Sequence, residues 1–82
     1  MEIFAKELSD KTVVGSDGAV VGDLHNVSIN FKTGELENLI VTPDGSPTEQ
    51  QKHRAKYNST DEGRYLISST SVRAVKDQIV VE

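Results

Sequence analysis

The feature that most constrains the fold is the stretch Val13–Val41, in which three apolar segments are separated by two tight turns. The first turn contains Ser16-Asp17-Gly18, and the second contains Lys32-Thr33-Gly34. Glycine adopts the positive φ of such turns at little steric cost, and Asp-Gly between apolar residues is a strong hairpin signal. The stretch therefore predicts a β-meander of three antiparallel strands.

In the middle strand of this meander the apolar residues change parity partway along. Val20, Gly22 and Leu24 stand at even positions, whereas the apolar residues of Val27–Phe31 stand at odd positions. Side chains alternate strictly along a strand, so one extra residue must intervene if both sets are to face inward. We expect a β-bulge near His25-Asn26, which would bend the strand and help the sheet to curl into a barrel.

The third strand has apolar residues of both parities. Leu36 and Ile40 should face one side, and Leu39 and Val41 the other. A strand with this pattern is expected to be covered on both faces along part of its length.

The region of about residues 44–58 is polar and can be read in two ways. Ser46-Pro47-Thr48-Glu49 fits a capping box with proline at the first helical position, which favours a short helix. Ala55 is the only apolar residue from Ser46 to Lys56, so such a helix would have little to bury, and a polar loop remains the alternative.

The remaining segments complete a small all-β domain. Ile3-Phe4 indicates an edge strand near the N-terminus, and Tyr65–Ile67 indicates a strand after the polar region. Ser69–Ser71 fits one 3₁₀ turn, and a closing strand pair follows over residues 72–75 and 78–81. We expect residues 1–82 to form a single domain, a small SH3-like β-barrel of five to seven antiparallel strands.

Composition restricts the classes of function. The chain has 82 residues, no cysteine and a formal net charge of −4. Without cysteine there are no disulfides or thiolate metal sites, and the acidic balance disfavours general binding to nucleic acid. No apolar run approaches the length of a membrane span, and no signal peptide is evident, so a cytoplasmic location is expected.

No arrangement of residues indicates catalysis or a cofactor. His25 and His53 are far apart and lack metal-ligand spacing, and no serine stands in a nucleophile elbow. The carboxylates fall mostly in turns or alternate along strands, as on a solvated face. The sequence therefore predicts a protein that is not an enzyme and that has neither metal nor cofactor.

Two candidate surfaces remain. Lys52, His53, Arg54 and Lys56 form a basic segment that could contact RNA or an anionic surface, although a solvated loop is the simpler interpretation. The second candidate is an interaction edge for copies of the chain or for a partner. It consists of the apolar segments at the two chain ends: Ile3, Phe4, Gln78, Ile79, Val80 and Val81. Alternatively, these two segments pair with each other and close the barrel.

The order of these motifs resembles the PRC-barrel domain, the module shared by the photosynthetic reaction centre H subunit and the ribosome-maturation factor RimM. The matching motifs are Val14–Gly18, Val21–Leu24, Thr33–Leu36 and Leu39–Val41, with a similar second half from Tyr65 to Val81. Among such domains the chain is most similar to the stand-alone archaeal proteins, although it has Lys76 where they often carry glycine and Ser68-Ser69 where a proline is usual.

The resemblance implies a non-enzymatic adaptor of the archaeal cell-division machinery. Members of that group form homo- or heterodimers with PRC-barrel copies and are partners of the membrane-anchoring protein SepF. The chain would then reach the division site and the membrane only indirectly, through a partner, and no contact with nucleic acid is expected. The alternative is a RimM-like ribosome-maturation or RNA-associated factor, for which Lys52–Lys56 is the only support.

Overall fold

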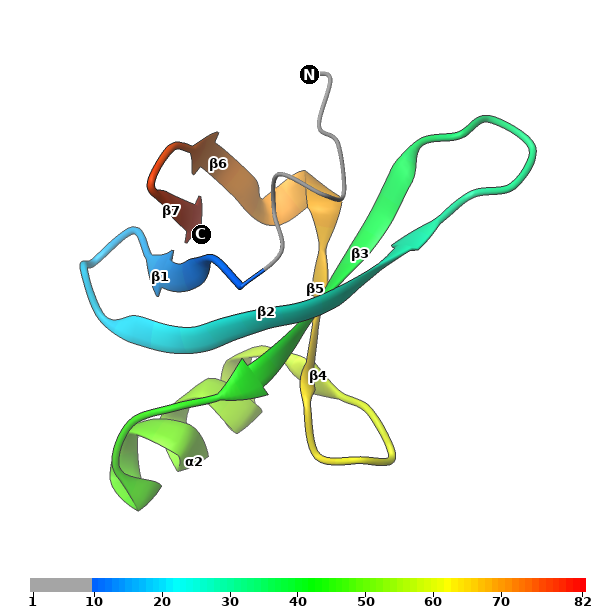
Figure 1. Cartoon of the computed structure of the whole chain (residues 1–82). Coiled ribbons are helices and arrows are strands. Elements are labelled where there is room, and N and C mark those ends of the chain that lie inside the picture. The colour runs from blue at the N-terminus through cyan, green and yellow to red at the C-terminus, as the bar shows by residue number, and fades with distance from the viewer. Residues whose placement is uncertain (1–9) are drawn as a thin grey trace.

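The computed structural model describes residues 10–82. Seven strands of this part of the chain form one sheet, in the order β4-β5-β3-β2-β1-β7-β6, together with one α-helix. The prediction of a small all-β barrel is confirmed. The elements are β1 (Thr12–Gly15), β2 (Val20–Ile29), β3 (Leu36–Pro43), α2 (Pro47–Lys56), β4 (Asn58–Ser59), β5 (Tyr65–Ser68), the 3₁₀ turn η1 (Ser69–Ser71), β6 (Val72–Val75) and β7 (Gln78–Val81) (Figure 1).

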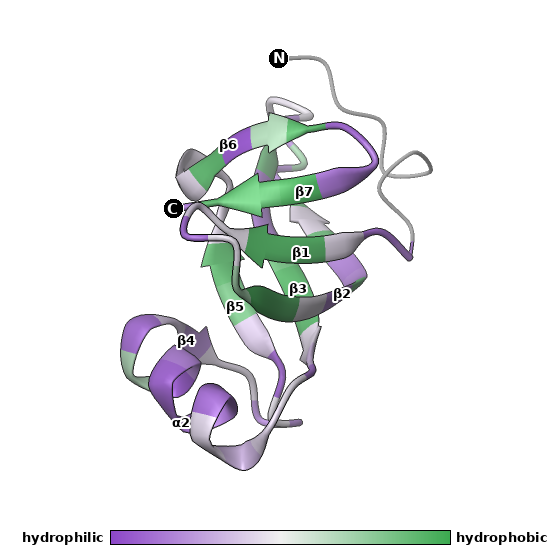
Figure 2. Cartoon of the chain, turned by 90° about the vertical axis from the view of Figure 1, so that its left-hand side faces the viewer, coloured by the Kyte–Doolittle hydropathy of each residue, from purple (hydrophilic) through white to green (hydrophobic). Residues whose placement is uncertain are grey.

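The sheet curls so that its two halves face each other. In Figure 2, β6, β7, β1 and the start of β2 lie in front of β3 and β5, while α2 covers one end. The strand pairs are antiparallel except that β1 and β7 run parallel, with Val13 opposite Ile79. This parallel pair differs from the expected all-antiparallel sheet. It forms because β7 reaches β1 from across the barrel and not through a hairpin, so no turn fixes their relative direction.

Both predicted turns of the meander are present. Gly18 has φ 89° and Gly34 has φ 75°, as the hairpins require. The first turn closes with the Gly15 N–H donating to Ala19 O at 2.8 Å, and the second with the Asn30 N–H donating to Glu35 O at 2.8 Å. Local turn chemistry is therefore sufficient to place the three strands β1, β2 and β3.

The predicted bulge in β2 is confirmed. Leu24 lies opposite Val41 and Asn26 lies opposite Ile40, so His25 is the extra residue. The bulge keeps Leu24 and Val27 both on the inner face, where Leu24 is buried and Val27 packs against the core. The bend at this point sends the second half of β2 away from the barrel (Figure 1).

A second bulge, which the sequence pattern did not reveal, lies at the start of β2. Val13 pairs with Gly22 and Val14 pairs with Val20, so Val21 is an extra residue. As a result Val21 is fully buried, whereas Val20 is 39% exposed. The expectation that Val20 shares the inner face of Leu24 is therefore wrong.

Gly22 lies where the backbone of β3 leaves no room for a side chain on β2. A Cβ at this position would lie 2.0 Å from Thr42 O and 3.0 Å from the Val41 side chain. Only glycine allows the two backbones to cross at this distance, so this position fixes the curl of the sheet.

The core lies between the two halves of the sheet. On β3, Leu39 and Val41 are buried, and Ile40 is half-buried on the opposite face. Leu36 packs against the core and does not share the face of Ile40, because the register shifts between Ser28 and Ile29. The buried residues that form the hydrophobic core cluster are Val13, Val21, Leu24, Leu39, Val41, Tyr65, Ile67, Ile79 and Val81.

Of the two interpretations of the polar region, the structure contains the helix. Ser46 caps α2, since its Oγ accepts a hydrogen bond from the Glu49 N–H at 3.2 Å, and Pro47 occupies the first turn. The capping residues predicted from the sequence therefore define the start of the helix.

Candidate interaction surfaces

The predicted edge at the C-terminal segment is not a free strand edge. β7 lies between β1 and β6 and pairs with both. Ile79 and Val81 point into the core, Gln78 is exposed, and Val80 is half-buried on the outer face. The prediction is wrong for this strand because its backbone groups are used on both sides. The other half of that prediction, Ile3 and Phe4, lies outside the described residues.

The residues of the predicted basic segment lie on α2 and differ in their exposure to solvent. Lys52, Arg54 and Lys56 are exposed, whereas His53 is only 7% exposed. The segment is therefore a helix with one buried side chain, and His53 does not belong to a basic surface.

His53 anchors α2 to the barrel through an aromatic cluster. Its ring centroid lies 6.2 Å from that of Tyr57 and 6.0 Å from that of Tyr65, which it meets edge-on at 82°. Such edge-to-face contacts are favourable, and they give an otherwise polar helix something to bury. The His53 Nδ1 atom is buried without a hydrogen-bond partner. Sequence reasoning missed this role because it counted His53 with the basic residues around it and not as an aromatic ring that could pack.

Two tyrosine hydroxyls complete the attachment of α2. The Tyr65 hydroxyl donates to Gln50 O at 3.3 Å, and the Tyr57 hydroxyl donates to Glu82 O at 3.0 Å. Burial raises the pKa of Tyr65, and the positive charge of Arg54 acts in the opposite direction. The helix is thus tied both to β5 and to the end of the described chain.

The cations of α2 lie near the turn between β1 and β2, which contains Asp17. The pKa of Asp17 is lowered, chiefly by the hydrogen bond from the Ala19 N–H and further by the positive charges of Lys52 and Lys56. Lys56 Nζ also lies 5.5 Å from the centroid of the Tyr57 ring. Part of the positive charge of α2 therefore interacts with the protein itself.

Among residues 10–82, the largest exposed apolar side chains lie elsewhere, at the β2–β3 hairpin. Phe31 is completely exposed, and Ile29 is 43% exposed. The strand pattern predicted Phe31 on the inner face, which is wrong because the strand ends at Ile29 and Phe31 belongs to the turn. Asn30 could have signalled this end, since its Oδ1 accepts hydrogen bonds from the Lys32 and Thr33 N–H groups.

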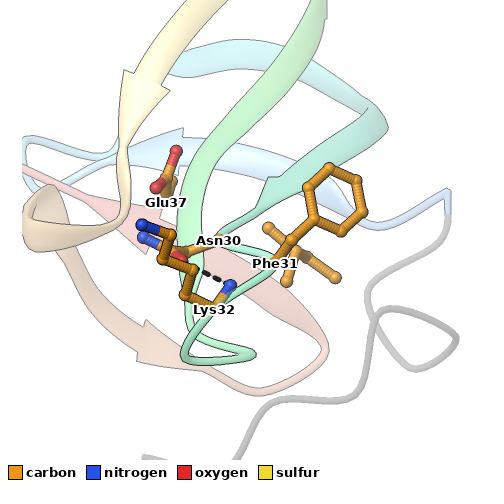
Figure 3. Close-up of a pocket in the computed structure, with 5 residues that line it drawn as sticks. Asn30, Phe31, Lys32 and Glu37 are labelled. Carbon is orange, nitrogen blue, oxygen red and sulfur yellow. Dashed lines mark hydrogen bonds between the residues drawn. The ribbon is translucent and has the colours of Figure 1, made fainter.

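The hairpin also carries an open depression of about 540 Å³. Figure 3 shows Lys32 and Glu37 on one side of the hairpin and the Phe31 ring on the other. The depression is lined by Ile29, Asn30, Phe31, Lys32 and Glu37. An exposed aromatic ring beside a shallow recess is typical of contact surfaces between proteins.

Residues with catalytic or metal-binding potential are dispersed in the part of the chain that the structure describes. His25 is exposed at the bulge of β2, whereas His53 is buried on α2. Among residues 10–82, no three His, Asp or Glu side chains gather in a way that could hold a metal ion. None of the helices in this range has the length and apolar character needed to cross a bilayer.

The fold and these surfaces define a small curled β-sheet domain that exposes Phe31 on the hairpin between β2 and β3. The family model described as the PRC-barrel domain matches residues 1–82. The chain belongs to the PRC-barrel family, as its turn and strand motifs predicted. No curated protein matches this sequence.

Proposed function

We propose that this protein is a non-enzymatic adaptor that associates with copies of itself and with other proteins. The observation that carries the proposal is the position of Phe31, which is fully exposed on a hairpin that extends from the barrel. Exposing a phenylalanine to water is unfavourable, and aromatic residues of this kind are enriched where proteins bind each other. The hairpin therefore supports a role in protein contact.

The cellular role that we propose is in archaeal cell division, with SepF as the partner. Its support is the resemblance of the motifs Val14–Gly18 and Val21–Leu24 to stand-alone archaeal PRC-barrel proteins. The net charge of −4 agrees with a protein partner better than with a phosphate backbone or an anionic lipid surface. In this proposal the protein stays in the cytoplasm and reaches the division site through SepF.

Calorimetric titration with a purified archaeal SepF tests this proposal. We expect saturable binding that Phe31→Ser weakens by about tenfold or more, as for the removal of a central aromatic contact. Val20→Ser is the matched control, because Val20 is also an exposed apolar residue but lies on the part of β2 paired with β1. The absence of binding at high micromolar concentrations would overturn the SepF assignment.

RNA binding is the alternative function, and the exposed Lys52, Arg54 and Lys56 on one helix are the observation that favours it. If it is correct, RNA should bind at low salt, lose affinity steeply as salt rises, and no longer bind when these three residues are changed to alanine. That result would replace the adaptor proposal. Equal weak binding by wild type and the triple variant would exclude the RNA role.

A further inference from the structure

The outer half of β2 has an edge that no strand among residues 10–82 covers. β1 pairs with β2 only as far as Asp23, and the Leu24 N–H still donates to Lys11 O at 2.9 Å. Beyond this point β2 pairs with β3 alone. Because β5 pairs with the other edge of β3 from Asn38 to Val41, only the part beyond Ser28 continues as a two-stranded ribbon to the hairpin turn (Figure 1). A two-stranded ribbon of this kind gains little stability by itself.

Backbone hydrogen-bonding groups of β2 point toward this open edge. The Asn30 N–H donates across the hairpin to Glu35 O, and these groups alternate in direction along a strand. Ile29 and Val27 therefore direct their N–H and C=O groups away from β3. The Val27 N–H agrees with this direction, because its partner is Asn26 Oδ1 at 2.8 Å, a side chain of the preceding residue.

The charge of this edge indicates what can pair with it. The eight residues from Leu24 to Phe31 include no Lys, Arg, Asp or Glu, in a chain of which 27% is charged. Exposed edges are usually blunted by lysine or proline, and neither is present here. Because each copy carries a net charge of −4, two copies meet at the least electrostatic cost through a neutral segment, which places no like charges in direct contact.

We propose that two copies of this chain pair antiparallel through the outer edge of β2, with Val27 of one copy opposite Ile29 of the other. This inference rests on the self-association included in the proposed function and identifies its surface. A two-fold axis repeats each contact, so that the apolar pair forms twice and Ser28 meets its own equivalent on the opposite face. The Asn26 carboxamide must then release the Val27 N–H, which donates to Ile29 O of the second copy.

Sedimentation velocity over a range of protein concentrations tests the pairing. Wild type should form a dimer, and Ile29→Lys should weaken it by about tenfold or more, because it places an unpaired charge opposite the apolar Val27 of the second copy. Ile29 is 43% exposed in the single copy, so the variant should fold. Val20→Lys is the control, since Val20 is 39% exposed and lies on the part of β2 paired with β1. Its dimer should match wild type.

For Asn26→Ala we expect the opposite effect on dimerisation. Without the carboxamide the Val27 N–H has no internal acceptor, so dimerisation should become several-fold tighter. Dimers that Ile29→Lys leaves intact would overturn this edge but not self-association. A wild type that is monomeric at all concentrations would overturn both. Binding to SepF is measured separately and is decided by neither result.

Discussion

The two ends of the long β2–β3 ribbon use apolar residues in opposite ways. At the near end, where β2 begins and β3 ends, Leu24 and Val41 are buried in the core and α2 covers the barrel. At the far end, Ile29 and Phe31 extend into solvent on the hairpin. The same strands therefore supply folding energy at one end and a contact surface at the other, and the bulge at His25 separates the two.

The largest expected difference in the free energy of unfolding comes from replacing one glycine at each end of the ribbon. In Gly22→Ala the new Cβ would lie 2.0 Å from Thr42 O, so we expect a loss of about 3 kcal/mol or more in the free energy of unfolding. Gly34→Ala meets no atom within 4 Å and only adds a residue at positive φ, which costs about 1–2 kcal/mol. Urea unfolding of both variants gives the comparison. Equal losses would mean that the near end is not held by this close approach.

Truncating one apolar side chain at each end is the next test. Leu24→Ala should lower the free energy of unfolding by about 3 kcal/mol, since the side chain is 4% exposed and its removal leaves a cavity. Ile29→Ala should change it by less than about 0.5 kcal/mol in dilute protein, because the residue is already exposed. A large effect of Ile29→Ala on the monomer would show that the far end contributes to folding, contrary to this comparison.

At the near end, replacing His53 should have a smaller effect on stability, and one of opposite sign. Its Nδ1 is buried without a partner, so His53→Leu should stabilise the protein by about 1 kcal/mol while still filling the space between the two tyrosines. Arg54→Leu, one residue along and exposed, should change stability by less than about 0.5 kcal/mol. Thermal unfolding followed by circular dichroism measures both. Destabilisation by His53→Leu would indicate that the imidazole makes a polar contact that α2 requires.

A structural feature could be predicted from the sequence when the residues that cause it are neighbours along the chain. The turns at Gly18 and Gly34 depend on a few adjacent residues, and the bulge at His25 follows from the parity of its own strand. The helix start at Ser46 is local in the same way. These features were accessible because neighbouring residues alone determine them.

The features that sequence reasoning missed depend on distant partners. His53 is buried because Tyr65 of β5 lies beside it, and β7 pairs with β1 because the sheet closes on itself. The same closure removed the predicted edge at Gln78–Val81. The exposure of Phe31 is an intermediate case, since Asn30 marks the strand end but the alternating pattern continues beyond it.

The smallest effect concerns pH, and it distinguishes the turn that precedes β2 from the turn that follows it. At the near end Asp17 Oδ1 accepts the Ala19 N–H at 3.1 Å, and at the far end Asn30 Oδ1 accepts the Lys32 N–H at 2.8 Å. The two side chains have the same role, but only the carboxylate titrates. The pKa of Asp17 is held below its ordinary value of 3.8, first by that hydrogen bond and then by Lys52 and Lys56.

A lowered pKa in the folded state means that the unfolded chain binds the proton more readily. The stabilisation from Asp17 is therefore present above about pH 3.8 and is lost as the pH falls through the lower pKa of the folded state. Asp17→Asn should make stability less dependent on pH in this acid range, and Asn30→Asp should make it more dependent. Urea unfolding at a series of pH values from neutral to strongly acidic measures both slopes. If Asp17→Asn leaves the acid dependence of stability unchanged, folding does not lower the pKa of Asp17, and neither the Ala19 N–H nor the cations of α2 stabilise its carboxylate.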